Sequence, residues 1–145
     1  MQEQNFKNHA RMVPLYHYVT STLILIAVAG SVIKLCRNYS TGHGGLLIPG
    51  LFLLLSVIVL LIAWFARAFA LKAQDRAIRA EENLRYFAMT GNLLDSKLTM
   101  RQIIALRFAP NNELLDLAHK AITENLSAKE IKQAIQHWKA DNDRV

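Results

Sequence analysis

Charged side chains are segregated along this chain rather than interleaved with apolar ones. Residues 12–66 contain only two charged side chains, Lys34 and Arg37, whereas residues 67–145 contain 23. A soluble domain of this size alternates apolar and polar positions with the period of a helix or a strand. The segregation therefore excludes a single soluble globule and predicts an apolar block in a membrane, followed by a polar tail.

Two uncharged stretches within this block are long enough to cross a membrane. They cover residues 12–33 and 46–66, and a helix of either length spans about 30 Å, the thickness of the hydrocarbon core. Leu, Ile, Val and Phe make up 15 of 21 residues in the second stretch but only 10 of 22 in the first. The first therefore needs a packing partner. An alternative is that it is a signal peptide cleaved after Ala29, because Ala27-Val28-Ala29 resembles a cleavage site.

We expect the two spans to form an antiparallel hairpin, because the link between them is short and contains three glycines. Pro49 falls in the first turn of the second helix, where a missing N–H is tolerated. The expected fold is an all-α membrane protein in which the second span extends into a cytoplasmic stalk and ends in a small helical module. Its expected parts are an N-terminal segment (1–11), a first span (12–35), a periplasmic turn (36–45), a second span (46–66), the stalk (67–90) and the C-terminal module (91–145).

The distribution of Lys and Arg predicts the orientation of the hairpin. Seven such residues lie near the outer ends of the spans, against two in the link. Because positive charge is enriched on the cytoplasmic side, both termini should be cytoplasmic. Four aromatic residues fall at the matching interface, where amphipathic rings prefer to lie: Tyr16, Tyr18, Trp64 and Phe65.

The stalk should be one continuation of the second helix, because no Gly or Pro occurs between Gly50 and Gly91. Asp75 with Arg79 and Glu81 with Arg85 are spaced as acid-first i,i+4 pairs, which suit a solvated helix. The large apolar residues of the stalk are too sparse to predict a coiled coil. A solvated stalk and a partner-binding helix both remain open.

The C-terminal module carries clear helix-start signals. Thr99 with Gln102 and Ser127 with Glu130 are both spaced as capping boxes. Residues 110–112 should end one helix and cap the next, which runs from Glu113 to about residue 125. The last helix should present an apolar stripe formed by Ile131, Ala134, Ile135 and Trp138. Because three short helices make a small core, the module should lean on Tyr86, Phe87 and Leu93 of the stalk or on a partner.

Small residues in the first span form a candidate helix-packing face. They are Thr20, Ala27, Gly30 and Ser31. Helices in lipid pack closely where side chains are small. The face could serve the hairpin itself or a different membrane subunit, and the spacing leaves both open.

The sequence contains no motif that assembles a reactive site. It lacks a phosphate-binding glycine loop, and its five histidines show no metal-ligand spacing. The tail mixes 13 basic with 10 acidic residues, unlike the clustered charge of a nucleic-acid-binding surface. We therefore expect no catalytic residue, cofactor, metal or nucleic acid. An active site completed by another chain remains the alternative to a non-enzymatic role.

Four segments resemble an uncharacterised family of short two-span membrane proteins from Bacteroidota-type bacteria. They are residues 5–17, 73–87, 98–114 and 131–145. The resemblance covers nearly the whole chain and implies a bacterial inner-membrane location with an intact stalk and tail. It implies no catalytic residue. The residues that match the family's pattern, and are the first to test for partner contact, are Arg76, Arg79, Glu82, Arg85, Arg107, Phe108 and Trp138.

These observations favour an accessory or adaptor protein whose hairpin sits in the lipid bilayer and presents a helical tail to another membrane or cytoplasmic protein. The alternative is a homo-oligomeric membrane protein or small pore, in which the small residues of several copies meet at an axis. The first hypothesis predicts a complex with a different protein, whereas the second predicts an assembly of copies of this chain alone.

Overall fold

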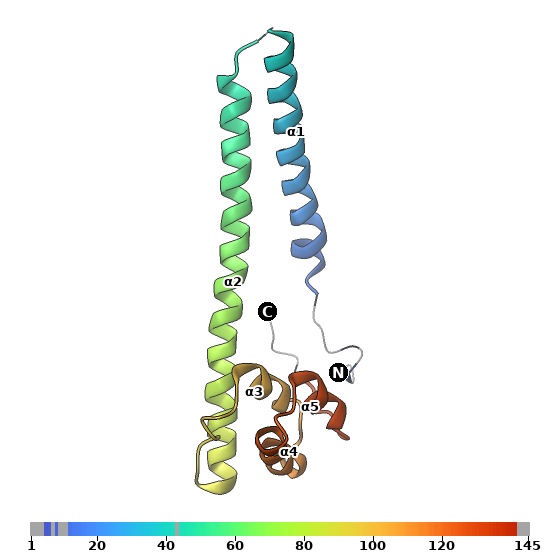
Figure 1. The fold of residues 1–145 in the computed structure, drawn as a ribbon, viewed down its shortest axis with the longest axis vertical. Helices are drawn as coiled ribbons and strands as arrows, with labels where there is room; N and C mark the ends of the chain where they lie inside the picture. The colour runs from blue at the N-terminus through green and yellow to red at the C-terminus, as the bar shows by residue number, and fades with distance from the viewer. Residues whose placement is uncertain (1–4, 7, 9–11, 43, 142–145) are drawn as a thin grey trace. The chain divides into compact units, whose positions relative to one another are not determined.

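The computed structural model describes residues 5, 6, 8, 12–42 and 44–141, and over these residues it is all-helical (Figure 1). The all-α expectation is therefore confirmed for the described part of the chain. One compact unit comprises Met12–Ala70, and another contains the chain from Leu71 onward. The elements in chain order are a π-helix η1 (Leu15–Thr20), α1 (Ser21–Thr41), α2 (Leu47–Thr90), α3 (Met100–Leu106), α4 (Asn111–Thr123) and α5 (Ala128–Ala134).

The first two long helical stretches, Leu15–Thr41 and Leu47–Thr90, are both long and apolar enough to cross a membrane. In the most apolar window of each, only 6% of the residues are buried inside the protein. The core helix of a soluble protein would be mostly covered by its own chain. The apolar side chains of these two helices therefore lack protein cover over most of their surface.

The first long helix extends further than the sequence indicates. It continues through Cys36 to Thr41, so the segment expected as a turn, residues 36–45, is helical as far as Thr41. Gly42 ends the helix in the left-handed conformation, at φ 62°, which glycine adopts without a Cβ penalty. Pro49 lies in the first turn of α2, as expected.

A π-turn precedes α1. The hydroxyl of Thr20 donates to the carbonyl oxygen of Leu15 at 3.1 Å, and that of Ser21 donates to the carbonyl of Tyr16 at 3.2 Å. The phenol of Tyr16 donates to the carbonyl oxygen of Ala63 on α2 at 2.6 Å. This bond joins the two helices within their unit and sets Tyr16 level with Ala63.

Helix α2 runs unbroken for 44 residues, which confirms the predicted continuation of the second apolar stretch into the stalk. It contains about 66 Å of helix at 1.5 Å per residue. Gly91 follows its last residue with a φ of 74°, a left-handed conformation that stops the helix where the sequence indicates.

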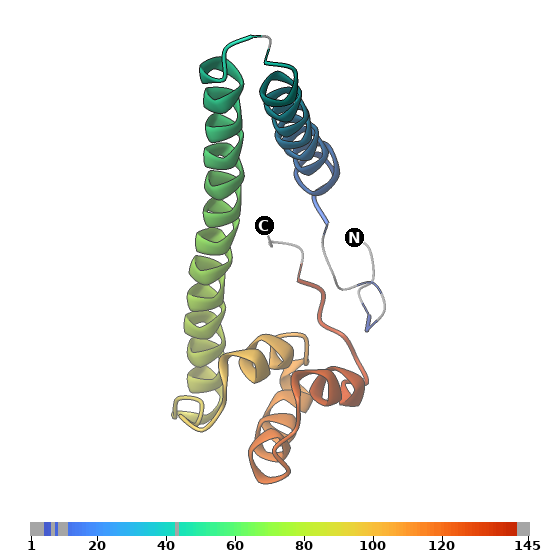
Figure 2. The ribbon, with the colours of Figure 1, turned by 45° about the horizontal axis from the view of Figure 1, so that its top comes forward.

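The C-terminal module packs around a small, fully apolar centre. Both predicted capping boxes are confirmed, at Thr99 with Gln102 and at Ser127 with Glu130. Helices α3, α4 and α5 are joined by short connections and pack together (Figure 2). The largest side chains that they bury completely are Phe108, Ile103, Leu106, Leu114 and Ile131.

Two expected features of the module are wrong. Helix α4 begins at Asn111 and has no side-chain cap, because its N-cap residue is Pro110, which has no side-chain acceptor, and the Asn111 side chain accepts a bond from Arg85. Helix α5 ends at Ala134, and Ile135 is extended, so no helical stripe reaches Trp138. Ile135 is nevertheless buried and Trp138 packs on the core. Ile135 and Trp138 therefore reach the core as expected, but through an extended chain and not as part of a helix.

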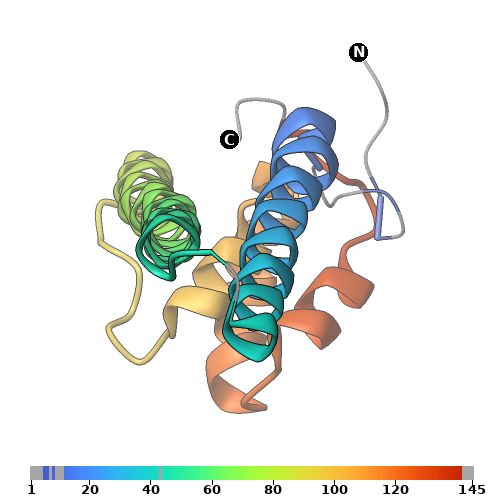
Figure 3. The same cartoon turned by 90° about the horizontal axis from the view of Figure 1, so that it is seen from above.

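The module rests on one face of the stalk, and its helices lie to one side of α2 (Figure 3). Ile78 is buried in the shared core, and Tyr86 packs against it as expected. Phe87 and Leu93, by contrast, are 49% and 65% exposed, so their predicted role in this contact is wrong. Phe87 follows Tyr86 by one residue, which turns its side chain about 100° away on a helix.

Candidate functional site

Arg85 fastens the module to the stalk. Its guanidinium donates to the carbonyl oxygen of Ala109 at 2.7 Å, to Asn111 Oδ1 at 2.8 Å and to Glu82 Oε2 at 3.1 Å. Ala109 and Asn111 lie in the module, at the connection between α3 and α4. One planar guanidinium thus bridges α2 and a turn more than 20 residues further along the chain, a geometry suited to arginine and unsuited to lysine.

The acidic partner of Arg85 differs from the expected one. The sequence spacing pairs Glu81 with Arg85, but the structure pairs Arg85 with Glu82, three residues before it on the helix. The Glu82 and Arg85 side chains are only 7% and 13% exposed. Glu82 faces the module, whereas Glu81 is exposed to solvent. A buried carboxylate needs a charged partner, and Arg85 supplies one.

Arg107, Phe108 and Trp138 form a second cluster inside the module. Arg107 Nη1 lies 3.0 Å from Asp141 Oδ2, and its guanidinium carbon lies 4.7 Å from the centre of the Phe108 ring. The rings of Phe108 and Trp138 are 5.0 Å apart between centroids. Phe108 has no exposed surface and Arg107 is 7% exposed. In this fold the cluster holds the module together.

Residues 135–141, which we call the C-terminal segment, are fastened to the module by main-chain contacts. Glu113 of α4 accepts the backbone N–H groups of Gln136 and His137, at 2.9 and 3.0 Å. The N–H of Lys139 donates to the carbonyl oxygen of Phe108 at 2.8 Å. In a continuing helix these N–H groups would bond to carbonyls four residues earlier. The Glu113 carboxylate takes two of them, which explains why α5 stops.

The environment of Glu113 keeps its carboxyl group ionised. Its partial burial disfavours the charged form, but hydrogen bonds from Gln136 and His137 outweigh that cost, and the pKa of Glu113 lies below its ordinary value of 4.5. The His137 ring also contacts the carboxylate, with Nδ1 2.9 Å from Oε1, although this ring is 77% exposed. Three groups of the C-terminal segment, two main-chain N–H groups and one ring nitrogen, therefore lie at this carboxylate.

Gln102 is a structural residue that the sequence marks only as a helix cap. Its Oε1 accepts the N–H of Thr99 at 2.8 Å, completing the capping box. Its Nε2 donates to the carbonyl oxygens of Ala121 and Leu126, at 3.2 and 2.9 Å. Gln102 therefore joins the start of α3 to the end of α4 and the connection that follows it.

The seven residues proposed for partner contact divide into two groups. Glu82, Arg85, Arg107, Phe108 and Trp138 make contacts within the module or between it and the stalk. Arg76 and Arg79 are exposed on the stalk. Of the seven, only these two are exposed and accessible to a partner of the folded chain.

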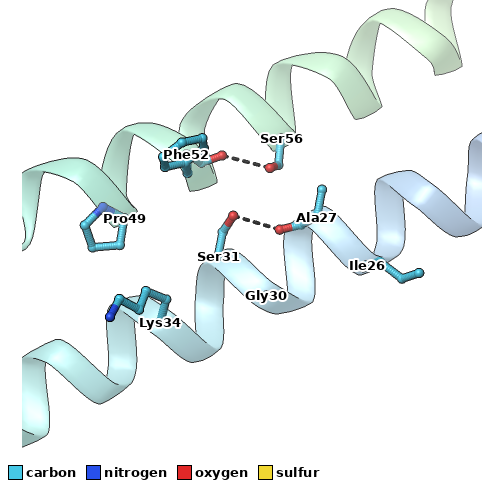
Figure 4. A pocket seen from close by; sticks show the side chains of 8 residues that line it. All are labelled: Ile26, Ala27, Gly30, Ser31, Lys34, Pro49, Phe52 and Ser56. Atoms are coloured by element: carbon cyan, nitrogen blue, oxygen red, sulfur yellow. Dashed lines mark hydrogen bonds between the residues drawn. The ribbon is translucent and has the colours of Figure 1, made fainter.

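The small residues of α1 face α2 across a cleft of about 300 Å³ (Figure 4). Ala27, Gly30 and Ser31 line it, whereas Thr20 bonds within η1. The hydroxyl of Ser31 donates to Ala27 and that of Ser56 to Phe52, so both bond to their own helix. A Cβ added at Gly30 would meet nothing within 4 Å. Close helix contact within this hairpin therefore does not require that glycine.

Within the described part of the chain, no group of three or more His, Cys, Asp and Glu residues could hold a metal ion. The one cysteine, Cys36, is exposed on α1.

The geometry defines a class of helical protein with two helices that are long and apolar enough to span a membrane and a clamped C-terminal module. The chain belongs to the family of unknown function DUF6526, and the match covers residues 1–145. No curated protein and no solved structure matches it significantly. The resemblance to an uncharacterised family is thereby confirmed at the level of an unknown-function family.

Replacing Arg85 with alanine should loosen the module from the stalk. The change leaves the buried Glu82 carboxylate and the Ala109 carbonyl without their donor, which costs about 2–3 kcal/mol. Arg79→Ala is the matched control, because Arg79 lies on the same helix and is exposed, and should cost less than about 0.5 kcal/mol. Amide hydrogen exchange of α3–α5 in the detergent-solubilised chain measures both. Equal protection in the two variants would contradict the role given to Arg85.

Acidification should release the C-terminal segment. Because the folded-state pKa of Glu113 is lowered, its contribution is complete above the ordinary value of 4.5 and is lost as the pH falls through the lowered pKa. Trp138 fluorescence in a Trp64→Phe background reports the release, since these are the two tryptophans. Glu113→Gln should abolish this acid transition, whereas Asp116→Asn, at an exposed carboxylate of the same helix, should retain it. An unchanged transition in Glu113→Gln would show that another group controls it.

Proposed function

We propose that this protein is an accessory or adaptor subunit of a bacterial inner membrane, anchored by a two-span hairpin with both termini in the cytoplasm. In this proposal α1 and the apolar part of α2 cross the bilayer, and the C-terminal module is presented to a partner protein. The protein itself catalyses no reaction.

The membrane part of the proposal is supported by burial and charge together. The two apolar helices are only 6% buried in their most apolar windows, so a lipid environment supplies the cover that the chain does not. The excess of Lys and Arg at the outer ends of the spans, seven against two, favours cytoplasmic termini. The exposed Trp64 and Phe65 of α2 lie where an interfacial aromatic belt is expected.

The observation that carries the adaptor role is the use of charged residues in the tail. Arg85, Arg107 and Glu113 are all engaged in holding the module and stalk in one arrangement. These charged groups are thus engaged in holding a rigid shape, which a binding subunit needs, and are not left to act on a substrate. Arg76 and Arg79 remain exposed for a partner that carries acidic groups.

The pore alternative has less support. It requires a polar path where the small residues of α1 meet, but the hydroxyls of Ser31 and Ser56 in the cleft are engaged by their own helices. The cleft is lined otherwise by mostly apolar side chains such as Ile26 and Phe52. A lining of this kind offers little to a hydrated ion.

Reporter fusions test the topology. A fusion after Val145 should be active with a cytoplasmic reporter and inactive with a periplasmic one, because the charge balance directs both termini inward. A thiol reagent that does not cross membranes should reach Cys36 from the periplasm, because this residue follows the predicted first span, residues 12–35. The intact mass should be 16.4 kDa, whereas signal-peptide cleavage after Ala29 would remove about 3 kDa. Activity of the periplasmic fusion would contradict the proposal.

Co-purification tests the adaptor role. Extraction in mild detergent followed by mass spectrometry should recover a second protein in fixed ratio with this chain. Arg79→Glu should lower its yield, because it reverses the charge that the exposed stalk offers, whereas Arg101→Glu, at an exposed arginine of α3, serves as the matched control. A particle that contains only this chain, in one copy or several, would reject the adaptor role.

A further inference from the structure

One face of the stalk carries a regular row of apolar side chains that nothing else in the described part of the chain covers. We call this row the alanine seam. Its members, all of them exposed, are Ala73, Ala77, Ala80, Leu84 and Phe87. The intervals alternate between four and three residues, which is the a and d spacing of a heptad repeat. Counting back along α2, Ala70, Ala66 and Ala63 keep the same alternation, so the pattern extends over three heptads.

The alanine seam lies on the side of the stalk opposite the module. At 100° per residue, Ile78, Glu82 and Arg85 fall within a sector of about 60°, which is the face that the module covers. The centre of the seam is about 150° from the centre of that sector. Folding of the module therefore leaves the seam free, and a partner there would not displace the module.

We propose that two copies of this chain pair along the alanine seam as a parallel, two-stranded coiled coil. The proposal rests on the membrane anchoring given under Proposed function, because two copies held in one membrane with the same topology present their stalks side by side in the same direction. Each module then lies on the outer face of the pair, so the dimer presents two modules that point away from each other.

The charges beside the alanine seam indicate that its partner is a second copy of this chain. They also indicate that the two helices run parallel. Arg76 and Glu81 flank the seam on opposite sides, at heptad positions g and e, and both are exposed. In a parallel pair, a residue at g meets the residue at e five positions later on the other helix. Arg76 of each copy therefore meets Glu81 of the other, which gives two ion pairs by symmetry. An antiparallel pair would bring like positions together instead.

The size of the side chains along the seam fits pairing that depends on the membrane. Alanine lets two helix backbones approach closely but buries little apolar surface, so Leu84 and Phe87 supply most of it. Pairing through such a seam is weak between free helices. Anchoring two copies in one membrane raises their effective concentration and fixes their relative direction without any new contact.

Cysteine cross-linking in membrane vesicles, with the full-length chain in a Cys36→Ser background, tests the proposal. In a parallel pair in register, equivalent a and d positions meet, so Ala77→Cys and Ala80→Cys should each form a disulfide-linked homodimer on mild oxidation. Arg79→Cys is the matched control, because position 79 is equally exposed but lies about 130° from the seam. Its dimer yield should be at least about fivefold lower.

Charge exchange adds a test that misfolding cannot mimic. In the Ala77→Cys background, Arg76→Glu or Glu81→Arg should each lower the dimer yield at least about threefold, because each places like charges opposite one another. The double variant should restore the yield, because it re-forms both pairs with their signs exchanged. Equal yields at positions 77 and 79, failure of the double variant to restore dimers, or cross-links only to a different protein would each overturn the proposal.

The outcomes separate this proposal from the adaptor role. Seam-specific cross-linking in a particle without a second protein would support the coiled coil and reject the adaptor. Recovery of a partner by a chain that gives no seam-specific cross-link would support the adaptor and reject the coiled coil.

Discussion

In the proposed membrane arrangement, the peptide groups in the apolar half of α2 must be satisfied by the helix itself, because an unpaired N–H or C=O in lipid costs several kcal/mol. That requirement forces a helix up to about residue 66, and no glycine or proline breaks it before Gly91. The charged part of α2 that follows is long enough to have two distinct faces. One carries Ile78, Glu82 and Arg85 toward the module, and the other carries the alanine seam. Both faces exist because the helix formed by the apolar half of α2 continues into the stalk.

Polar side chains decide how the C-terminal module is assembled around its small apolar core. Arg85 joins the stalk to the turn between α3 and α4, Gln102 joins α3 to the end of α4, and Glu113 holds the chain beyond α5. Each of these side chains makes more than one hydrogen bond, and each satisfies main-chain groups that helix ends and turns leave unpaired. Shape in this module is therefore specified by directional contacts as much as by apolar burial.

Features with local causes could be predicted from the sequence, and features with distant causes could not. The long α2, its end at Gly91 and both capping boxes depend on residues within a few positions of one another. The end of α5 depends on Glu113, more than 20 residues earlier, and no local signal marks it. The sequence likewise does not distinguish Arg79, which is exposed, from Arg107, which is buried, because the fold decides which arginine is covered. The large apolar residues of the stalk do not mark the alanine seam, because most members of the seam are small and Leu71 and Ile78 lie off it.

The way in which Glu113 holds the C-terminal segment has a consequence for sequence variation. The carboxylate binds the main-chain N–H groups of residues 136 and 137, which every amino acid except proline provides. Side-chain identity at these two positions is therefore weakly constrained by the fold, whereas position 113 is strongly constrained. Related chains can diverge at positions 136 and 137 and still keep this attachment, provided that an acidic side chain remains on α4 and no proline enters the segment at either position.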